Sequence, residues 1–90
     1  MTITVYTLPA CVQCETTKRY LEKQEIDFKV VDISTDADAA EFVRGLGYTQ
    51  APVIVVETEE RAWSWSGFRL DKLQELAFDS KKSSEEIVAA

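Results

Sequence analysis

The stretch that decides the fold is TITVYTLPACVQC, residues 2–14, in which a strand pattern gives way to a helix pattern at two cysteines. Residues 2–7 alternate β-branched and aromatic side chains, which is typical of a strand. Pro9 interrupts this pattern, and from Val12 onward apolar residues recur at helical spacing. A Cys-x-x-Cys motif that follows a strand and opens a helix indicates a thiol redox site.

Cys11 and Cys14 are the two cysteines of the chain, which contains no histidine. The free N–H groups and the positive end of the dipole at a helix start stabilise a thiolate without a histidine base. We therefore expect Cys11, at the helix tip, to be the exposed nucleophile and Cys14, one turn further in, to be the buried resolving cysteine. Two alternatives stay open. Both cysteines could be small apolar core residues, or two chains could share a metal or an iron–sulfur cluster.

The composition excludes several classes of function. Ninety residues suit one small domain. A formal net charge of −6 argues against binding to nucleic acid or to an anionic membrane surface. Without histidine, the chain alone forms neither a Ser-His-Asp site nor a Cys₂His₂ zinc site, and we expect no metal site. No apolar run approaches the ~20 residues of a transmembrane helix, and the N-terminus shows no secretory signal pattern. We expect a cytoplasmic monomer.

The remaining sequence alternates strand and helix patterns. We expect the first helix to end at residues 24–25 and a second strand over 27–33, whose Val30 and Val31 suggest burial on both faces. Ser34 or Thr35 is the predicted cap of a second helix, which Gly47 ends. Two strands and a third helix follow, at residues 52–56, 61–65 and about 70–78.

The predicted order is β-α-β-α-β-β-α. A strand, a helix and a strand at the start imply a right-handed parallel unit. A short turn between the last two strands implies an antiparallel hairpin. The prediction is therefore an α/β domain over residues 1–78, with a four-stranded mixed sheet and helices on both faces. Residues 79–90 lose apolar periodicity and are expected to form a flexible C-terminal tail.

Two further segments are candidate parts of the site. Pro52 begins the third strand, and beside a Cys-x-x-Cys motif we expect its peptide bond to be cis. The backbone of Ala51 would then be free to pair with an extended substrate segment. The corner after the fourth strand carries Trp65 and Phe68 around Gly67, and these aromatic residues either fill the core or form an exposed recognition patch.

These motifs resemble the NrdH-redoxin family, whose members have the thioredoxin fold in its short glutaredoxin-like form. The resemblance covers residues 2–78 and is carried by Cys11-Val12-Gln13-Cys14, Gly47-Tyr48-Thr49-Gln50-Ala51-Pro52-Val53 and Trp65-Ser66-Gly67-Phe68-Arg69. It implies a thiol–disulfide oxidoreductase that donates electrons to class Ib ribonucleotide reductase. It also implies reduction by NADPH-dependent thioredoxin reductase, with no cofactor bound to the chain itself.

The resemblance also implies roles for particular residues. Cys11 would be the nucleophile and Cys14 the resolving cysteine, and the bend at Ala51 and Pro52 would contact the substrate. The corner near the active site would bind the partner through Trp65, Ser66, Gly67, Phe68 and Arg69.

The chain departs from the family pattern at three places. Leu8 replaces the usual lysine, Leu70 replaces the usual proline, and residues 57–64 suggest a longer, more acidic hairpin. The loss of the lysine at position 8 bears on how strongly the Cys11 thiolate is stabilised, and the acidic hairpin bears on how a partner docks. A glutathione-dependent glutaredoxin is one alternative function, although bulky Trp65 and Phe68 disfavour seating the tripeptide. A non-catalytic binding module or cluster scaffold with the same fold is another.

Overall fold

A computed structural model describes the backbone of residues 1–89 and the side chains of residues 1–79. The elements follow the predicted order: β1 Thr2–Thr7, α1 Val12–Lys23, β2 Lys29–Asp32, α2 Ala37–Gly45, β3 Val53–Glu57, β4 Ala62–Ser66 and α3 Leu70–Ala89. The strands lie in the order β2-β1-β3-β4. The β1–β2 pair is parallel and the other pairs are antiparallel, so the predicted mixed sheet of the thioredoxin fold is confirmed.

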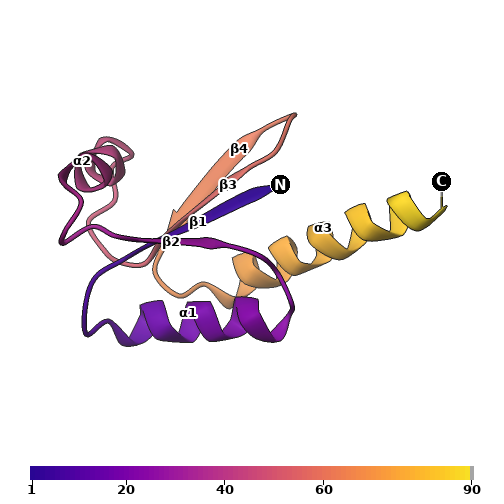
Figure 1. Ribbon diagram of the computed structural model, residues 1–90, viewed down its shortest axis with the longest axis horizontal. Coiled ribbons are helices and arrows are strands. Elements are labelled where there is room, and N and C mark those ends of the chain that lie inside the picture. Colours follow the sequence, from indigo (N-terminus) through magenta and orange to yellow (C-terminus); the bar gives the residue numbers. More distant parts are fainter. Residues whose placement is uncertain (90) are drawn as a thin grey trace.

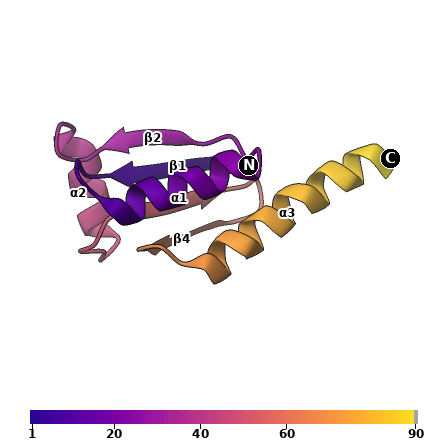
Figure 2. The same cartoon turned by 90° about the horizontal axis from the view of Figure 1, so that it is seen from below.

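Helices cover both faces of the sheet, with α1 and α3 on one side and α2 on the other (Figures 1 and 2). Successive side chains of β3 point to opposite faces of the sheet, so this strand contributes apolar residues to both layers of helices. Ile54 and Val56 belong to the core under α1 and α3, whereas Val53 and Val55 pack with Val43 of α2. The first four residues of β3 are buried, as expected for a central strand.

The prediction that β2 is buried on both faces is wrong. Val30 is 49% exposed and Val31 only partly buried. The reason is the strand order, which places β2 at the edge of the sheet beside β1. Two adjacent valines indicate a strand but do not show whether it lies at the centre or at the edge.

The start of α2 also differs from the prediction. Asp36, rather than Ser34 or Thr35, is the N-cap, and its carboxylate accepts a hydrogen bond of 3.0 Å from the N–H of Ala39. The carboxylate of Asp32 binds both the N–H and the hydroxyl of Ser34, at 2.8 and 2.6 Å. Ser34 is therefore held in the preceding turn, and the helix begins later.

The C-terminal helix is longer than predicted. Its backbone stays helical to Ala89, and Figure 1 shows α3 extending away from the sheet. Residues 80–89 include no glycine or proline, and lysine, glutamate and alanine favour a helix even without an apolar face. The loss of periodicity therefore does not mark the end of the helix. The boundary at residue 78 stays a prediction.

The C-terminus of α1 places a non-glycine residue in the left-handed region. The N–H of Ile26 donates to the carbonyl of Leu21, and the N–H of Glu25 donates to that of Glu22, both at 3.0 Å. This pattern requires a left-handed residue at its turn, where glycine is usual. Here Glu25 adopts φ 58°. At the end of α2, by contrast, Gly47 has φ 90°, in agreement with the prediction.

We expect Glu25→Gly to raise the free energy of unfolding by roughly 0.5–1 kcal/mol, because glycine adopts this backbone conformation without steric cost. The matched control is Glu22→Gly, the same replacement within α1, which should lower stability by about 0.5–1 kcal/mol. Denaturant unfolding of both variants measures the difference. Equal destabilisation by the two replacements would contradict this account.

Candidate active site

Cys11 occupies the N-cap of α1, the position where the chain turns into the helix. Its backbone is extended, with φ −103° and ψ 108°, and its sulfur accepts a hydrogen bond of 3.2 Å from the N–H of Cys14. A hydrogen bond to the charged form and the positive end of the helix dipole both stabilise a thiolate. The N-cap therefore places the sulfur of Cys11 at the partly exposed tip of the helix.

Cys14 lies one turn further along, on the face of α1 that packs against the sheet. It is 1% exposed, whereas Cys11 is partly exposed, and both thiols are free. Burial, followed by a side-chain hydrogen bond to Cys11, raises the pKa of Cys14 to about 11. The backbone of Leu8 and the positive charge of Lys18 act in the opposite direction. Near neutral pH Cys14 is therefore a protonated thiol beside an accessible sulfur.

The segment before β3 brings a second piece of backbone to the site. The peptide bond between Ala51 and Pro52 is cis, the isomer predicted from the sequence. The carbonyl of Pro52 accepts a hydrogen bond of 2.8 Å from the N–H of Gly67. This bond joins the start of β3 to the corner after β4.

A third contact joins that corner to the Cys-x-x-Cys motif. The side-chain oxygen of Gln13 accepts a hydrogen bond of 3.0 Å from the N–H of Phe68. Gly67 has φ 83°, and a Cβ atom there would lie 3.4 Å from the same oxygen of Gln13. The structure therefore brings the cysteines, the cis-proline bend and the corner together through two hydrogen bonds.

The corner residues divide between core and surface. Trp65 is 3% exposed in the core cluster under α1 and α3, so the structure places it beneath the site and not on a partner-contacting surface. Phe68 is half-buried against the same cluster, and Ser66 is half-buried at the end of β4. Arg69 is exposed, and its guanidinium binds the carboxylate of Asp71 at 2.8 and 3.1 Å. Of the two roles left open for Trp65, the core role is the one observed.

The three departures from the family pattern lie at different distances from the site. Leu8 is 42% exposed beside the cysteines, and Leu70 starts α3. The acidic connection is a tight turn of residues 58–61, closed by a 2.8 Å hydrogen bond from the N–H of Thr58 to the carbonyl of Arg61. The register pairs Val53 with Ser66, so this turn lies at the end of the hairpin remote from the cysteines. Leu8 is thus the departure closest to the chemistry.

Sequence reasoning missed Gln13 as a site residue. Its partner, Phe68, lies 55 residues away along the chain, and no periodicity reports such a contact. A polar residue inside the Cys-x-x-Cys motif was the available signal. Within residues 1–79 no group of three or more histidine, cysteine, aspartate or glutamate side chains is placed to hold a metal ion.

Comparison with known proteins identifies the family. The glutaredoxin family model matches residues 3–60. The chain is 41% identical over 76 residues to the glutaredoxin-like protein NrdH of Escherichia coli K12, which covers 84% of this chain and 89% of that protein. It is 35% identical over 75 residues to NrdH of Lactococcus lactis MG1363, which covers 83% and 99%. The chain belongs to the NrdH-redoxin family. As a member of this family it is a thiol–disulfide oxidoreductase.

A solved NrdH-redoxin has the same architecture. The structure from Escherichia coli matches with a TM-score of 0.76 at 41% identity, covering 84% of this chain and 95% of that chain. That protein is described as glutaredoxin-like with a thioredoxin-like activity profile. The cysteines and the cis-proline bend of this chain lie within residues 3–60, the part that the glutaredoxin family model matches.

We expect iodoacetamide to modify Cys11 and spare Cys14 in the reduced protein near neutral pH. Cys14 is buried, and only its thiolate would react, which requires the pH to approach about 11. Mass spectrometry of digests taken over a pH series measures both sites. Preferential labelling of Cys14 near neutral pH would contradict the assigned difference. Labelling in denaturant, where the two sites should react alike, serves as the control.

We expect Gln13→Ala to lower the free energy of unfolding by about 0.5–1.5 kcal/mol, because the N–H of Phe68 loses its acceptor. Amide hydrogen exchange at Phe68 should become faster. Gln74→Ala, at an exposed position of α3, is the matched control and should leave the exchange at Phe68 unchanged. Unchanged exchange in both variants would show that the hydrogen bond does not hold the corner.

Proposed function

We propose that this NrdH-redoxin is a dithiol reductant of protein disulfides. The observation that carries the proposal is the arrangement of the two sulfurs. A partly exposed Cys11 sulfur accepts the N–H of Cys14, whose own thiol is buried and protonated. One sulfur is thus placed to attack an external disulfide, while the second is held within reach to complete the exchange.

The proposed reaction has two exchange steps. The Cys11 thiolate attacks one sulfur of the target disulfide, which breaks that bond, forms a mixed disulfide and releases a target thiolate that takes up a proton. Cys14 then loses its proton and attacks the sulfur of Cys11. This step forms the Cys11–Cys14 disulfide and releases the second target thiol. Two electrons pass from the protein to the target, and the exchange needs no metal or bound cofactor.

In this proposal the backbone of Ala51 receives the target as an added strand. Ala51 is partly buried beside the cis bond, and its N–H makes none of the backbone hydrogen bonds found outside helices and strands within the described residues. An extended segment pairing there would lie next to the cysteines, since Pro52 is joined to the corner that contacts Gln13.

We further propose class Ib ribonucleotide reductase as a target and NADPH-dependent thioredoxin reductase as the source of electrons. The support is the membership of the NrdH-redoxin family and the thioredoxin-like activity profile of the Escherichia coli relative. No helix of the described chain is both long and apolar enough to cross a membrane. A dithiol that must stay reduced suits the cytoplasm, where we place this protein as a monomer.

Glutathione dependence is the second candidate function. The glutaredoxin family model favours it, but the surroundings of the cysteines do not. Leu8 provides no cation for a carboxylate, and the Gln13 side chain already occupies the N–H of Phe68 at the corner. We therefore rank thioredoxin reductase above glutathione as the reductant.

We expect the protein to support NADPH oxidation with thioredoxin reductase and a disulfide substrate such as insulin. The same substrate with glutathione and glutathione reductase should give at most a few per cent of that rate. Cys11→Ser should abolish activity, since no other exposed cysteine is available. Activity with glutathione alone would reject the proposed reductant. Inactivity in both assays would favour a binding module or cluster scaffold.

A further inference from the structure

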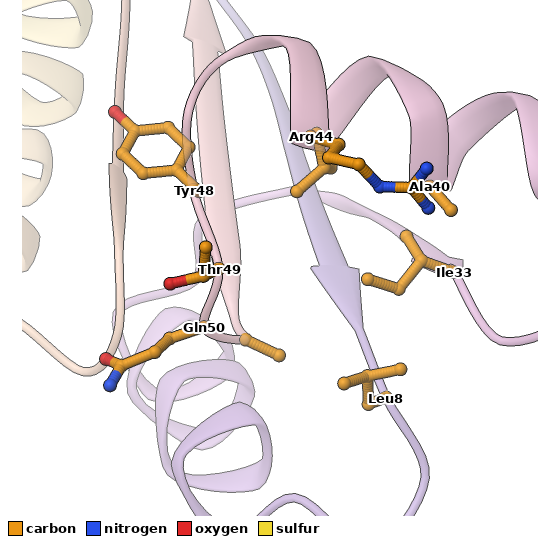
Figure 3. A pocket seen from close by; sticks show the side chains of 9 residues that line it. Leu8, Ile33, Ala40, Arg44, Tyr48, Thr49 and Gln50 are labelled. Atoms are coloured by element: carbon orange, nitrogen blue, oxygen red, sulfur yellow. The ribbon is translucent and has the colours of Figure 1, made fainter.

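A pocket next to the cis-proline bend is not used by the exchange chemistry. It has a volume of about 310 Å³, at the lower end for ligand pockets, and lies between the chain leading to Cys11 and the chain leading to Pro52. Figure 3 shows Leu8 and Ile33 on one side, facing the chain at Thr49 and Gln50 on the other. Ala51 completes the wall next to the cis bond.

The lining is apolar with a single charge. The apolar residues that line the pocket are Leu8, Ile33, Ala40, Val43 and Ala51. Arg44 is the one charged residue in the lining, and in Figure 3 its guanidinium lies over Ala40 at the α2 side. The hydroxyl of Tyr48 is already bound to Ser64 Oγ at 2.8 Å. The pocket therefore offers an apolar floor and one cation.

That cation has no internal partner in the part of the chain whose side chains are described. The ion pairs found there join Lys18 to Glu15, Arg61 to Asp79 and Arg69 to Asp71, and Arg44 is in none of them. Arg44 is exposed in a protein of net charge −6, so its charge is available to an external carboxylate. The overall negative charge repels long acidic runs, which favours recognition of one carboxylate at this place.

We infer that this pocket selects the target, by taking an apolar side chain next to the target disulfide while Arg44 pairs with one nearby carboxylate of the same segment. The inference rests on the proposed reduction of protein disulfides. A strand added at Ala51 would direct alternate side chains to one face, so that one of them enters the pocket while the target disulfide meets Cys11.

A protein segment fits this lining better than glutathione. The tripeptide carries two carboxylates, whereas the pocket supplies one cation and an apolar Leu8. An apolar side chain with a single carboxylate matches both the apolar lining and the one cation. Leu8, a departure from the family pattern, thus makes the pocket more apolar in this chain.

The test uses synthetic peptides that contain one intramolecular disulfide and differ at only two positions next to it. One position carries leucine or serine, and the other carries glutamate, glutamine or lysine. Stopped-flow measurement of the oxidation of the prereduced protein gives a rate constant for each peptide. Each rate is divided by the rate with hydroxyethyl disulfide, an uncharged small substrate, for the same variant. We expect the wild type to prefer the glutamate peptide over the lysine peptide by about three- to tenfold, less at high salt.

Charge reversal provides the decisive comparison. Arg44→Glu should invert the preference, and Arg44→Gln should remove it. Lys23→Glu changes the net charge equally at the far end of α1 and should keep the wild-type preference. Leu8→Asn should reduce the preference for leucine over serine by about two- to fivefold. Circular dichroism melting verifies that each variant is folded before the rates are compared.

The results that overturn the inference differ from those that overturn the proposed function. Equal effects of Arg44→Glu and Lys23→Glu would show only a general charge effect and reject the pocket. A dependence on Arg44 with glutathione disulfide but with no peptide would assign the pocket to the tripeptide instead. A wild-type protein that reduces no disulfide, including hydroxyethyl disulfide, would reject the proposed function and the inference with it.

Discussion

The hydrogen bond from the N–H of Cys14 to the sulfur of Cys11 is the interaction on which the rest of the site depends. A helix start leaves N–H groups without partners, and here a sulfur satisfies one of them. The same bond places Cys11 at the exposed tip and Cys14 on the buried face of α1. One local requirement of the helix therefore accompanies two thiols of different exposure, one partly exposed and one buried.

This local motif becomes a site only through the sheet. Because β3 runs antiparallel beside β1, the start of β3 meets the end of β1, which leads to the cysteines. The cis bend at Pro52 is thereby brought to the helix tip. Two hydrogen bonds, from Gly67 to Pro52 and from Phe68 to Gln13, then hold the corner against both segments. The corner contributes backbone groups to the site, while Trp65 supports it from the core.

The surroundings of the thiols decide which disulfide they can serve. Many proteins of this fold share the exchange chemistry, so selectivity must come from neighbouring side chains. Leu8 and Arg44 present an apolar surface with one cation. A site built for two carboxylates would instead offer a cation to each of them. The acidic turn of residues 58–61 lies at the remote end of the hairpin and has no direct contact with the thiols.

The sequence alone determined the element order, the roles suggested for Cys11 and Cys14, and the central position of β3. These features depend on local spacing, capping and the run of apolar residues, all of which are visible along the chain. Only the tertiary structure decided that Val30 lies at an edge, that Trp65 is buried and that Gln13 accepts a bond from Phe68. Strand order and contacts between residues 55 positions apart arise from packing, which local patterns do not encode.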